Sequence, residues 1–244
     1  AAEVVTDLAD GASSVYAVDI DGDLDMDILG TSALDDTVSW YESSYSWNQV
    51  GTDIDGSAAG DRSGVSVALS ADGTIMAVGA DLNDDAGADA GQVRMFQFDG
   101  TNWVQLGADI DGEAAGDNFG ERVALSNDGL TVAIGTRRND GGGTGVDTGH
   151  VQVYKFDGTS WLQQGADIDG EAAGDLSGQS VSLSADGLTV AIGANSNDGG
   201  GANAGHTRIF DFNGTVWAQR GTDIDGNIGD QAGVSVSLSD DGDT

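Results

Sequence analysis

Short apolar runs separated by turn residues return along this chain at a nearly constant interval. The clearest copy has runs at residues 181–183, 188–192 and 207–210 and a fourth run that begins at a tryptophan. Runs of three to six residues bounded by turns, without a 3.6-residue period, predict β-strands rather than helices. Tryptophans mark the phase of the repeat at intervals of 56 to 58 residues: Trp47, Trp103, Trp161 and Trp217.

Turn residues connect these runs in the same way in each copy. An Asp-Gly pair separates the first two runs, and a second Asp-Gly or Asn-Gly pair separates the last two. Tight hairpin turns need backbone with positive φ, which glycine adopts without steric cost. Each copy therefore predicts one antiparallel sheet of four strands. The pairs lie at residues 72–73, 128–129, 186–187 and 241–242, and at 99–100, 157–158 and 213–214.

A chain of such sheets predicts an all-β fold, a β-propeller of four-stranded antiparallel blades. An array of β-sandwiches is the alternative, but a unit of about 57 residues is too small for a sandwich. We expect one propeller domain over residues 1–244, with about 4.5 repeats. The repeats fall at about residues 1–46, 47–102, 103–160, 161–216 and, incomplete, 217–244.

The incomplete last unit leaves an open sheet edge in this prediction. Residues 233–239 would supply an inner strand of that blade, and residues 3–8 have the phase of its outer strand. An unpaired edge invites strand addition from another chain. Two explanations stay open: a fragment of a longer propeller, or a subunit that polymerises when a neighbour completes the sheet.

The charge of the chain narrows the classes of partner. The formal charge is −34 at pH 7, with 42 acidic residues against 8 Lys and Arg. Nucleic acids and anionic membranes bind clustered cationic side chains, so both are excluded as expected partners. Repulsion among so many carboxylates destabilises the folded state unless salt or bound cations screen it. The acidic charge indicates an extracellular protein, whereas the absence of cysteine does not fix the compartment. The start at Ala1-Ala2-Glu3 fits a mature N-terminus after signal removal, or an excised fragment.

The first unit carries a candidate metal loop. Where later units have a short S-x-D-G hairpin, this unit reads D-x-D-G-D-x-D-x-D from residue 19 to residue 27. Ca²⁺ prefers six to eight hard oxygen ligands in a flexible geometry, and acidic residues at alternate positions of a tight loop converge on one point. We expect Ca²⁺ on the side chains of Asp19, Asp21, Asp23 and Asp27 and on the carbonyl of Asp25. An acidic, solvated turn without a metal is the alternative.

At these residues the chain resembles the integrin-type FG-GAP and VCBS repeats. The acidic loop is followed by Trp40-Tyr41, and later units have Phe119-Gly120. Val78-Gly79-Ala80 is matched by Ile134-Gly135-Thr136 and Ile192-Gly193-Ala194. The resemblance implies calcium-binding loops in propeller blades and a role in adhesion. Leu24 stands where that loop usually has a second glycine, and the short hairpins at Asp72, Asp128 and Asp186 carry no metal.

Other recurring polar residues have a structural and a functional interpretation. Three sets of aspartates surround a repeated D-I-D-G sequence, which indicates either weak cation sites between blades or loop capping by Asp and Gly. His150 and His206 share a phase with Gln92, which favours a structural hydrogen bond over a metal role. We expect packing roles for Trp103, Trp161 and Trp217, with stacking on a sugar as the alternative. Asn213-Gly-Thr215 is a glycosylation sequon. The aspartate sets are Asp53, Asp55, Asp61; Asp109, Asp111, Asp117; and Asp167, Asp169, Asp175.

The sequence holds no recognisable nucleophile–base pair, phosphate loop or histidine–carboxylate constellation, so we expect a protein that is not an enzyme. A fold does not fix a function, because propellers host enzymes as well as binding proteins. The leading hypothesis is a secreted, calcium-stabilised propeller in adhesion, or a structural or fibre subunit, with other protein subunits as partners. The alternative is a carbohydrate-binding, lectin-like module with extracellular polysaccharide as its partner.

Overall fold

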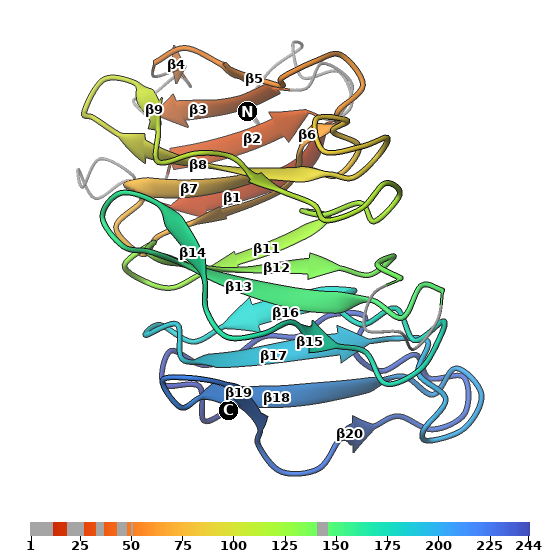
Figure 1. Ribbon diagram of the computed structural model, residues 1–244. Helices are drawn as coiled ribbons and strands as arrows, with labels where there is room; N and C mark the ends of the chain where they lie inside the picture. Colours follow the sequence, from red (N-terminus) through yellow and green to blue (C-terminus); the bar gives the residue numbers. More distant parts are fainter. Residues whose placement is uncertain (1–11, 19–26, 33–36, 43–47, 50, 141–145) are drawn as a thin grey trace, which may run out of the picture.

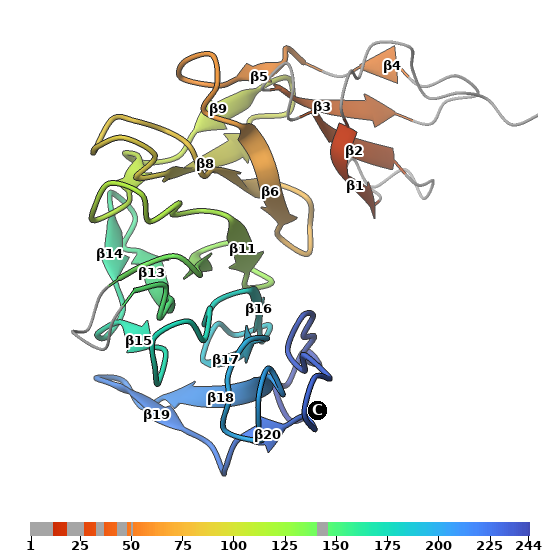
Figure 2. The same ribbon diagram turned by 90° about the vertical axis from the view of Figure 1, so that its right-hand side faces the viewer.

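The computed structural model describes residues 12–18, 27–32, 37–42, 48–49, 51–140 and 146–244. Within these ranges the chain forms only β-strands, in four antiparallel sheets that follow one another along an open arc (Figures 1 and 2). The predicted all-β, propeller-like architecture is confirmed. No helix in these ranges has the length and apolar character to cross a membrane.

Each sheet contains five strands in sequence order. The first is built from β1 (Ala12–Val18), β2 (Asp27–Ser32), β3 (Thr37–Glu42), β4 (Asn48–Gln49) and β5 (Ile54–Asp55). The second contains β6 (Ser63–Leu69), β7 (Ile75–Ala80), β8 (Gln92–Phe98), β9 (Trp103–Gln105) and β10 (Ile110–Asp111). The third contains β11 (Arg122–Leu125), β12 (Thr131–Thr136), β13 (His150–Phe156), β14 (Trp161–Gln163) and β15 (Ile168–Asp169). The fourth contains β16 (Ser180–Leu183), β17 (Thr189–Ala194), β18 (His206–Phe212), β19 (Trp217–Gln219) and β20 (Ile224–Asp225).

The outer strand of each blade is split into two short pieces. In the second blade both β9 and β10 pair with β8, with Trp103 opposite Phe98 and Ile110 opposite Val93. Gly107 lies between the two pieces with φ +82°, a conformation that glycine adopts without strain. The D-I-D sequence, expected in a loop that opens the next unit, therefore completes the outer strand of the preceding sheet.

The predicted hairpin turns are present between the first two strands of each later blade. In the second blade the Asp72 carboxylate accepts hydrogen bonds from the Ser70 hydroxyl at 2.6 Å and from the Thr74 amide at 3.0 Å. Gly73 has φ +69°, and the glycines of the matching turns at 129, 187 and 242 have φ between +69° and +70°. The Ser-x-Asp-Gly sequence thus fixes the turn locally, without a metal.

The hydrophobic cores lie between the blades. All six residues of β7 are buried, and they alternate between two clusters: Met76 and Val78 face the first blade, whereas Ile75 and Ala77 face the third. The middle strands β12 and β17 are buried along their whole length in the same way. Among the described residues each hydrophobic cluster is shared by two blades, so the blades depend on their neighbours for stability.

Glycines allow the blades to approach to backbone contact. A Cβ at Gly79 of β7 would lie 2.0 Å from the carbonyl oxygen of Gly120 in the next blade. The Ser66 hydroxyl also donates to this carbonyl, at 2.7 Å. The same contact joins Gly135 to Gly178 and Gly193 to Gly233.

Tryptophans hold the outer edges of neighbouring blades together. The indole N–H of Trp161 donates to the Leu106 carbonyl of the preceding blade at 2.8 Å, and Trp217 donates to the Gln164 carbonyl at 2.6 Å. Each ring also packs on a phenylalanine of its own blade, with a centroid separation of 5.1 Å for Phe156 and Trp161. These contacts are those of packing residues, as expected for the tryptophans.

The start of a further unit docks on the fourth blade. The Ala232 amide donates to the Ala204 carbonyl at 2.9 Å. Gly233 makes the same close backbone contact with Gly193 that Gly120 makes with Gly79. Residues 233–239 do not form the expected strand, because no described segment lies beside them to complete a ladder. Residues 3–8 lie outside the described ranges.

Trp161→Phe tests this joint between blades. The phenyl ring keeps the packing on Phe156 but cannot donate to the Leu106 carbonyl, so we expect the free energy of unfolding to fall by about 1–2 kcal/mol. Urea denaturation measures the change. Leu162→Ala, at a neighbouring side chain that is 55% exposed, is the control and should change little. Equal stabilities of Trp161→Phe and the wild-type protein would contradict the role of the hydrogen bond.

Candidate cation sites between the blades

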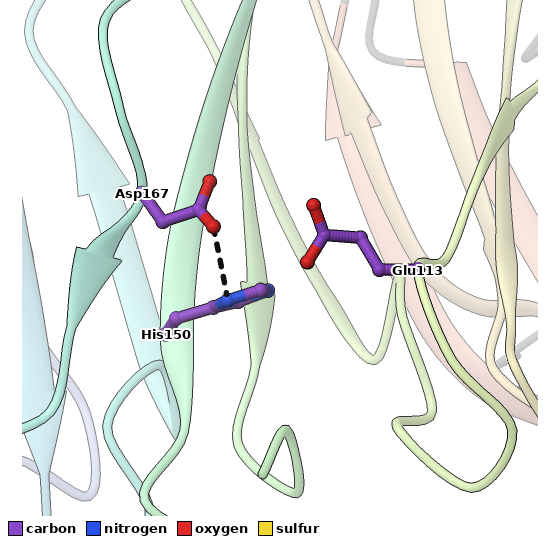
Figure 3. Close-up of side chains that lie close together, drawn as sticks. All are labelled: Glu113, His150 and Asp167. Carbon is purple, nitrogen blue, oxygen red and sulfur yellow. Dashed lines mark ion pairs between the residues drawn. The ribbon is translucent and has the colours of Figure 1, made fainter. Parts of the chain in front are cut away.

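Two carboxylates and a histidine meet where the second blade joins the third (Figure 3). His150 is the first residue of β13, Asp167 precedes β15 of the same blade, and Glu113 follows β10 of the preceding blade. His150 is opposite Asp169 in the sheet, which brings the start of β13 close to the segment that holds Asp167. One ligand atom from each of the three residues lies within 4.8 Å of the other two.

The same arrangement recurs one junction later. Glu171, His206 and Asp223 occupy the corresponding positions between the third and fourth blades. Nδ1 of His206 lies 3.8 Å from a carboxylate oxygen of Glu171 and 3.8 Å from one of Asp223. In the first cluster Nδ1 of His150 lies 3.9 Å from Asp167. These separations are too long for hydrogen bonds.

Both imidazoles are buried, with 1% of each residue exposed. Among the described residues, Nδ1 of His150 and both ring nitrogens of His206 have no hydrogen-bond partner. The structural hydrogen bond that the sequence predicted for these histidines is therefore not formed by His206. Gln92, at the same position of the second blade, does form hydrogen bonds, including one of 3.0 Å from its amide to Asp111.

Burial affects the imidazole of His150, and Gln152 orients the two carboxylates. Burial lowers the pKa of His150, against the nearby charges of Asp167 and Glu113, which raise it. The amide of Gln152 donates to Glu113 at 3.0 Å and to Asp167 at 2.9 Å. The Tyr154 hydroxyl donates to the Gln152 carbonyl oxygen at 3.2 Å, and burial raises the pKa of Tyr154 to about 12.

The aspartate sets that the sequence singled out separate into different environments. Asp61, Asp117 and Asp175 are buried, and each accepts a hydrogen bond from the amide of an asparagine 22 residues later. Asp109 and Asp167 instead accept from Gln105 and Gln163 at 2.6 Å. Within the described part of the chain, no set of three forms a single cation site, which was one of the two alternatives, and only Asp167 belongs to a cluster with other ligands. The asparagine donors are Asn83, Asn139 and Asn197.

The predicted calcium ligands lie largely outside the described residues. Asp19, Asp21, Asp23 and Asp25 fall between the end of β1 and the start of β2. Asp27 begins β2, opposite Val18, and its side chain is also outside the description. The calcium loop therefore stays a prediction.

Sequence reasoning missed Glu113, Glu171 and Asp223 as partners of the histidines. The expectation of no histidine–carboxylate constellation is wrong. Sheet pairing brings Asp167 and Asp223 to the histidines 17 positions before them, and the packing of blades brings Glu113 and Glu171 to the histidines 37 and 35 positions after them. The available signal was that Glu and His recur together in the third and fourth copies and are both absent from the second. An almost fully buried imidazole can accept a small ion but leaves little access for a larger substrate.

Comparisons with known proteins agree with the propeller-like architecture. The profile of the FG-GAP repeat matches residues 109–154, a segment that includes Gly120, Gly135 and two residues of the first cluster. The chain carries an FG-GAP repeat. Gly120 of this repeat meets Gly79 of the preceding blade at the glycine joint, and Gly135 meets Gly178 of the following blade. No curated protein matches the sequence significantly.

Two similar solved structures are proteins assigned provisionally as 6-phosphogluconolactonases. The one from Bacteroides uniformis ATCC 8492 has a TM-score of 0.60 and 10% identity, and the alignment covers 87% of this chain and 55% of that one. The one from Bacteroides fragilis NCTC 9343 has a TM-score of 0.62 and 12% identity, with 92% and 56% covered. The chain thus spans about half of their length, and at this identity the likeness shows the fold alone.

A further buried carboxylate, Asp81, lies beside the junction of the second and third blades. It is 3% exposed, it pairs with Arg62 at 3.0 Å, and its backbone carbonyl accepts from Asn118. Burial raises the pKa of Asp81 from 3.8 to about 6, although Arg62 lowers it. Because this folded-state pKa lies above the unfolded value, the ionised carboxylate costs stability above pH 6 and the cost disappears as the pH falls toward 4.

Asp81→Asn removes this ionisation. We expect the variant to be more stable than the wild-type protein at pH 7, by about 1–3 kcal/mol, and the difference to shrink as the pH is lowered from 7 to 4.5. Thermal unfolding of both proteins across this range measures the effect. A difference that does not change with pH would contradict the raised pKa.

Proposed function

We propose that this FG-GAP chain is part of a non-catalytic propeller that acts outside the cell as a cation-stabilised scaffold in adhesion or in a structural assembly. The proposal rests on one observation: the residues that recur from blade to blade make contacts between blades. The tryptophans and glycines that recur in the later blades, together with Ser66 and Ser180, hold neighbouring blades together. A scaffold of this kind presents loops of variable sequence on a rigid frame.

Calcium at the Asp19–Asp27 loop is part of this proposal. Five aspartates within nine residues repel one another strongly unless a cation neutralises them. The later hairpins satisfy their single aspartate with a serine hydroxyl and backbone amides. The acidic loop of the first unit lacks the Ser-x-Asp-Gly sequence. This difference supports a metal ion as the partner of its aspartates.

A carbohydrate-binding function is the second candidate. A cleft of about 610 Å³ lies between the outer edges of the third and fourth blades, lined in part by Phe156, Leu162, Phe212, Asp157 and Gln163. Apolar rings beside carboxylate and amide groups suit a sugar, which has apolar faces and hydroxyl edges. The tryptophans next to this cleft are engaged in blade packing, so stacking on a sugar would fall to the phenylalanines and Leu162.

Removal of calcium tests the proposed scaffold. A ligand that binds only the folded state stabilises it by RT ln(1 + [L]/Kd), about 2.7 kcal/mol at a hundredfold excess over Kd. We expect a calcium chelator to lower the melting temperature and Asp21→Asn to abolish most of this response. Asp72→Asn, in a hairpin without a predicted metal, is the matched control and should keep the response. A melting curve that is unchanged by the chelator would overturn the calcium part.

Binding assays separate the two candidate functions. The chain is presented to immobilised copies of itself, to extracellular matrix proteins and to a polysaccharide array, with calcium and with chelator. Calcium-dependent binding to protein surfaces supports adhesion or assembly. Binding to glycans that Leu162→Asp abolishes supports the lectin-like function, and turnover of a small-molecule substrate would overturn the non-catalytic proposal.

A further inference from the structure

We propose that the Glu113–His150–Asp167 cluster is a site for a divalent transition metal ion, for which Zn²⁺ is the probe, and that the ion cross-links the second and third blades. The Glu171–His206–Asp223 cluster would be a second, weaker site of the same kind. These sites are separate from the proposed calcium loop. They share no residue with it and lie at later junctions.

The first argument is the state of the histidine nitrogens. Both residues are 1% exposed, and the Nδ1 atom that faces the carboxylates has no hydrogen-bond partner in either cluster among the described residues. A buried polar atom without a partner costs about 1–3 kcal/mol. His206 leaves both ring nitrogens in this condition. A metal ion at Nδ1 would give the lone pair a partner that the protein itself does not supply.

The second argument is the geometry of the carboxylates. Oxygens of Glu171 and Asp223 both lie 3.8 Å from Nδ1 of His206, and Figure 3 shows the corresponding groups pointing toward one another in the first cluster. Zinc–ligand bonds of about 2.0–2.2 Å place neighbouring ligand atoms roughly 3.3–3.5 Å apart. The side chains of Glu171 and Asp223 are 44% and 28% exposed, so they can move the remaining distance while the imidazole stays fixed.

The ligand types select the class of metal. Calcium takes six to eight oxygen ligands, whereas a neutral imidazole with two carboxylates suits zinc and its neighbours in the transition series. Three protein ligands with water in the fourth position is a common zinc arrangement. The carboxylates come from both sides of the junction, so the bound ion would add a bond between the two blades.

The residue at position 152, and its equivalents at positions 208 and 94, determine which junction binds the metal ion more tightly. In the first cluster Gln152 donates to both carboxylates and adds no charge. In the second cluster Arg208 stands at that position, with its guanidinium 4.0 Å from Glu171. A guanidinium stays protonated and opposes the entry of a dication. The junction of the first and second blades has Arg94 together with Gln92 and Ser57 in place of histidine and glutamate, and it should bind no metal of this kind.

Isothermal titration calorimetry with zinc tests the proposal. The protein is first treated with chelator, calcium is then restored to saturation, and zinc is titrated in last. We expect two binding events in the wild-type protein. His150→Gln should remove the tighter event, and His206→Gln the weaker one. Both variants copy the natural Gln92 and are expected to fold. Magnesium should give neither event, because it prefers oxygen ligands.

Exchanging the residues at positions 152 and 208 distinguishes specific metal sites from adventitious binding to surface carboxylates. Arg208→Gln should tighten the second site by about tenfold, and Gln152→Arg should weaken the first by about as much, because these side chains contact the carboxylates that would hold the ion. Zinc binding that is the same in the double variant His150→Gln/His206→Gln as in the wild-type protein would overturn the proposal. An unchanged affinity in Arg208→Gln would overturn the proposed ranking, even if one of the histidine variants failed to fold.

Discussion

The close approach of one blade's middle strand to the backbone of the next blade is the constraint on which the rest of this structure depends. Gly135 faces the Gly178 carbonyl so closely that a Cβ would lie 2.4 Å from that oxygen, and Gly79 and Gly193 make the same approach. The approach lets both faces of the middle strands become fully buried, which places the hydrophobic cores between blades. It also brings the tryptophan donors and the histidine clusters within reach of the neighbouring blade.

A chain with a charge of −34 holds these junctions together by satisfying its acidic groups locally. Buried aspartates such as Asp117 accept from asparagine amides, and hairpin aspartates accept from serine hydroxyls and backbone amides. At the two histidine clusters, the imidazole nitrogen that faces the carboxylates has no hydrogen-bond partner among the described residues. We propose that bound cations neutralise the acidic groups at these junctions and at the acidic loop of the first unit.

The sequence predicted the parts of the fold that are encoded locally. Asp-Gly turns, apolar runs and the tryptophan phase depend on neighbouring residues, so strand order and hairpins could be read directly. The split outer strand was missed because Ile110–Asp111 is too short to stand out and is defined only by its pairing with β8. The histidine clusters were missed for a related reason: Glu113 and His150 belong to different blades, and only the packing of blades brings them together.

The most direct test of this account is the stability of Gly135→Ala compared with Gly158→Ala. The added methyl at 135 would clash with the Gly178 carbonyl, whereas at 158 it would meet open space and carry only the strain of φ +97°. Overpacking at a close contact costs about 1–3 kcal/mol or more, so we expect Gly135→Ala to lose clearly more unfolding free energy in urea. Equal losses for the two variants, or a smaller loss for Gly135→Ala, would contradict the claim that the glycine joint holds the blades together.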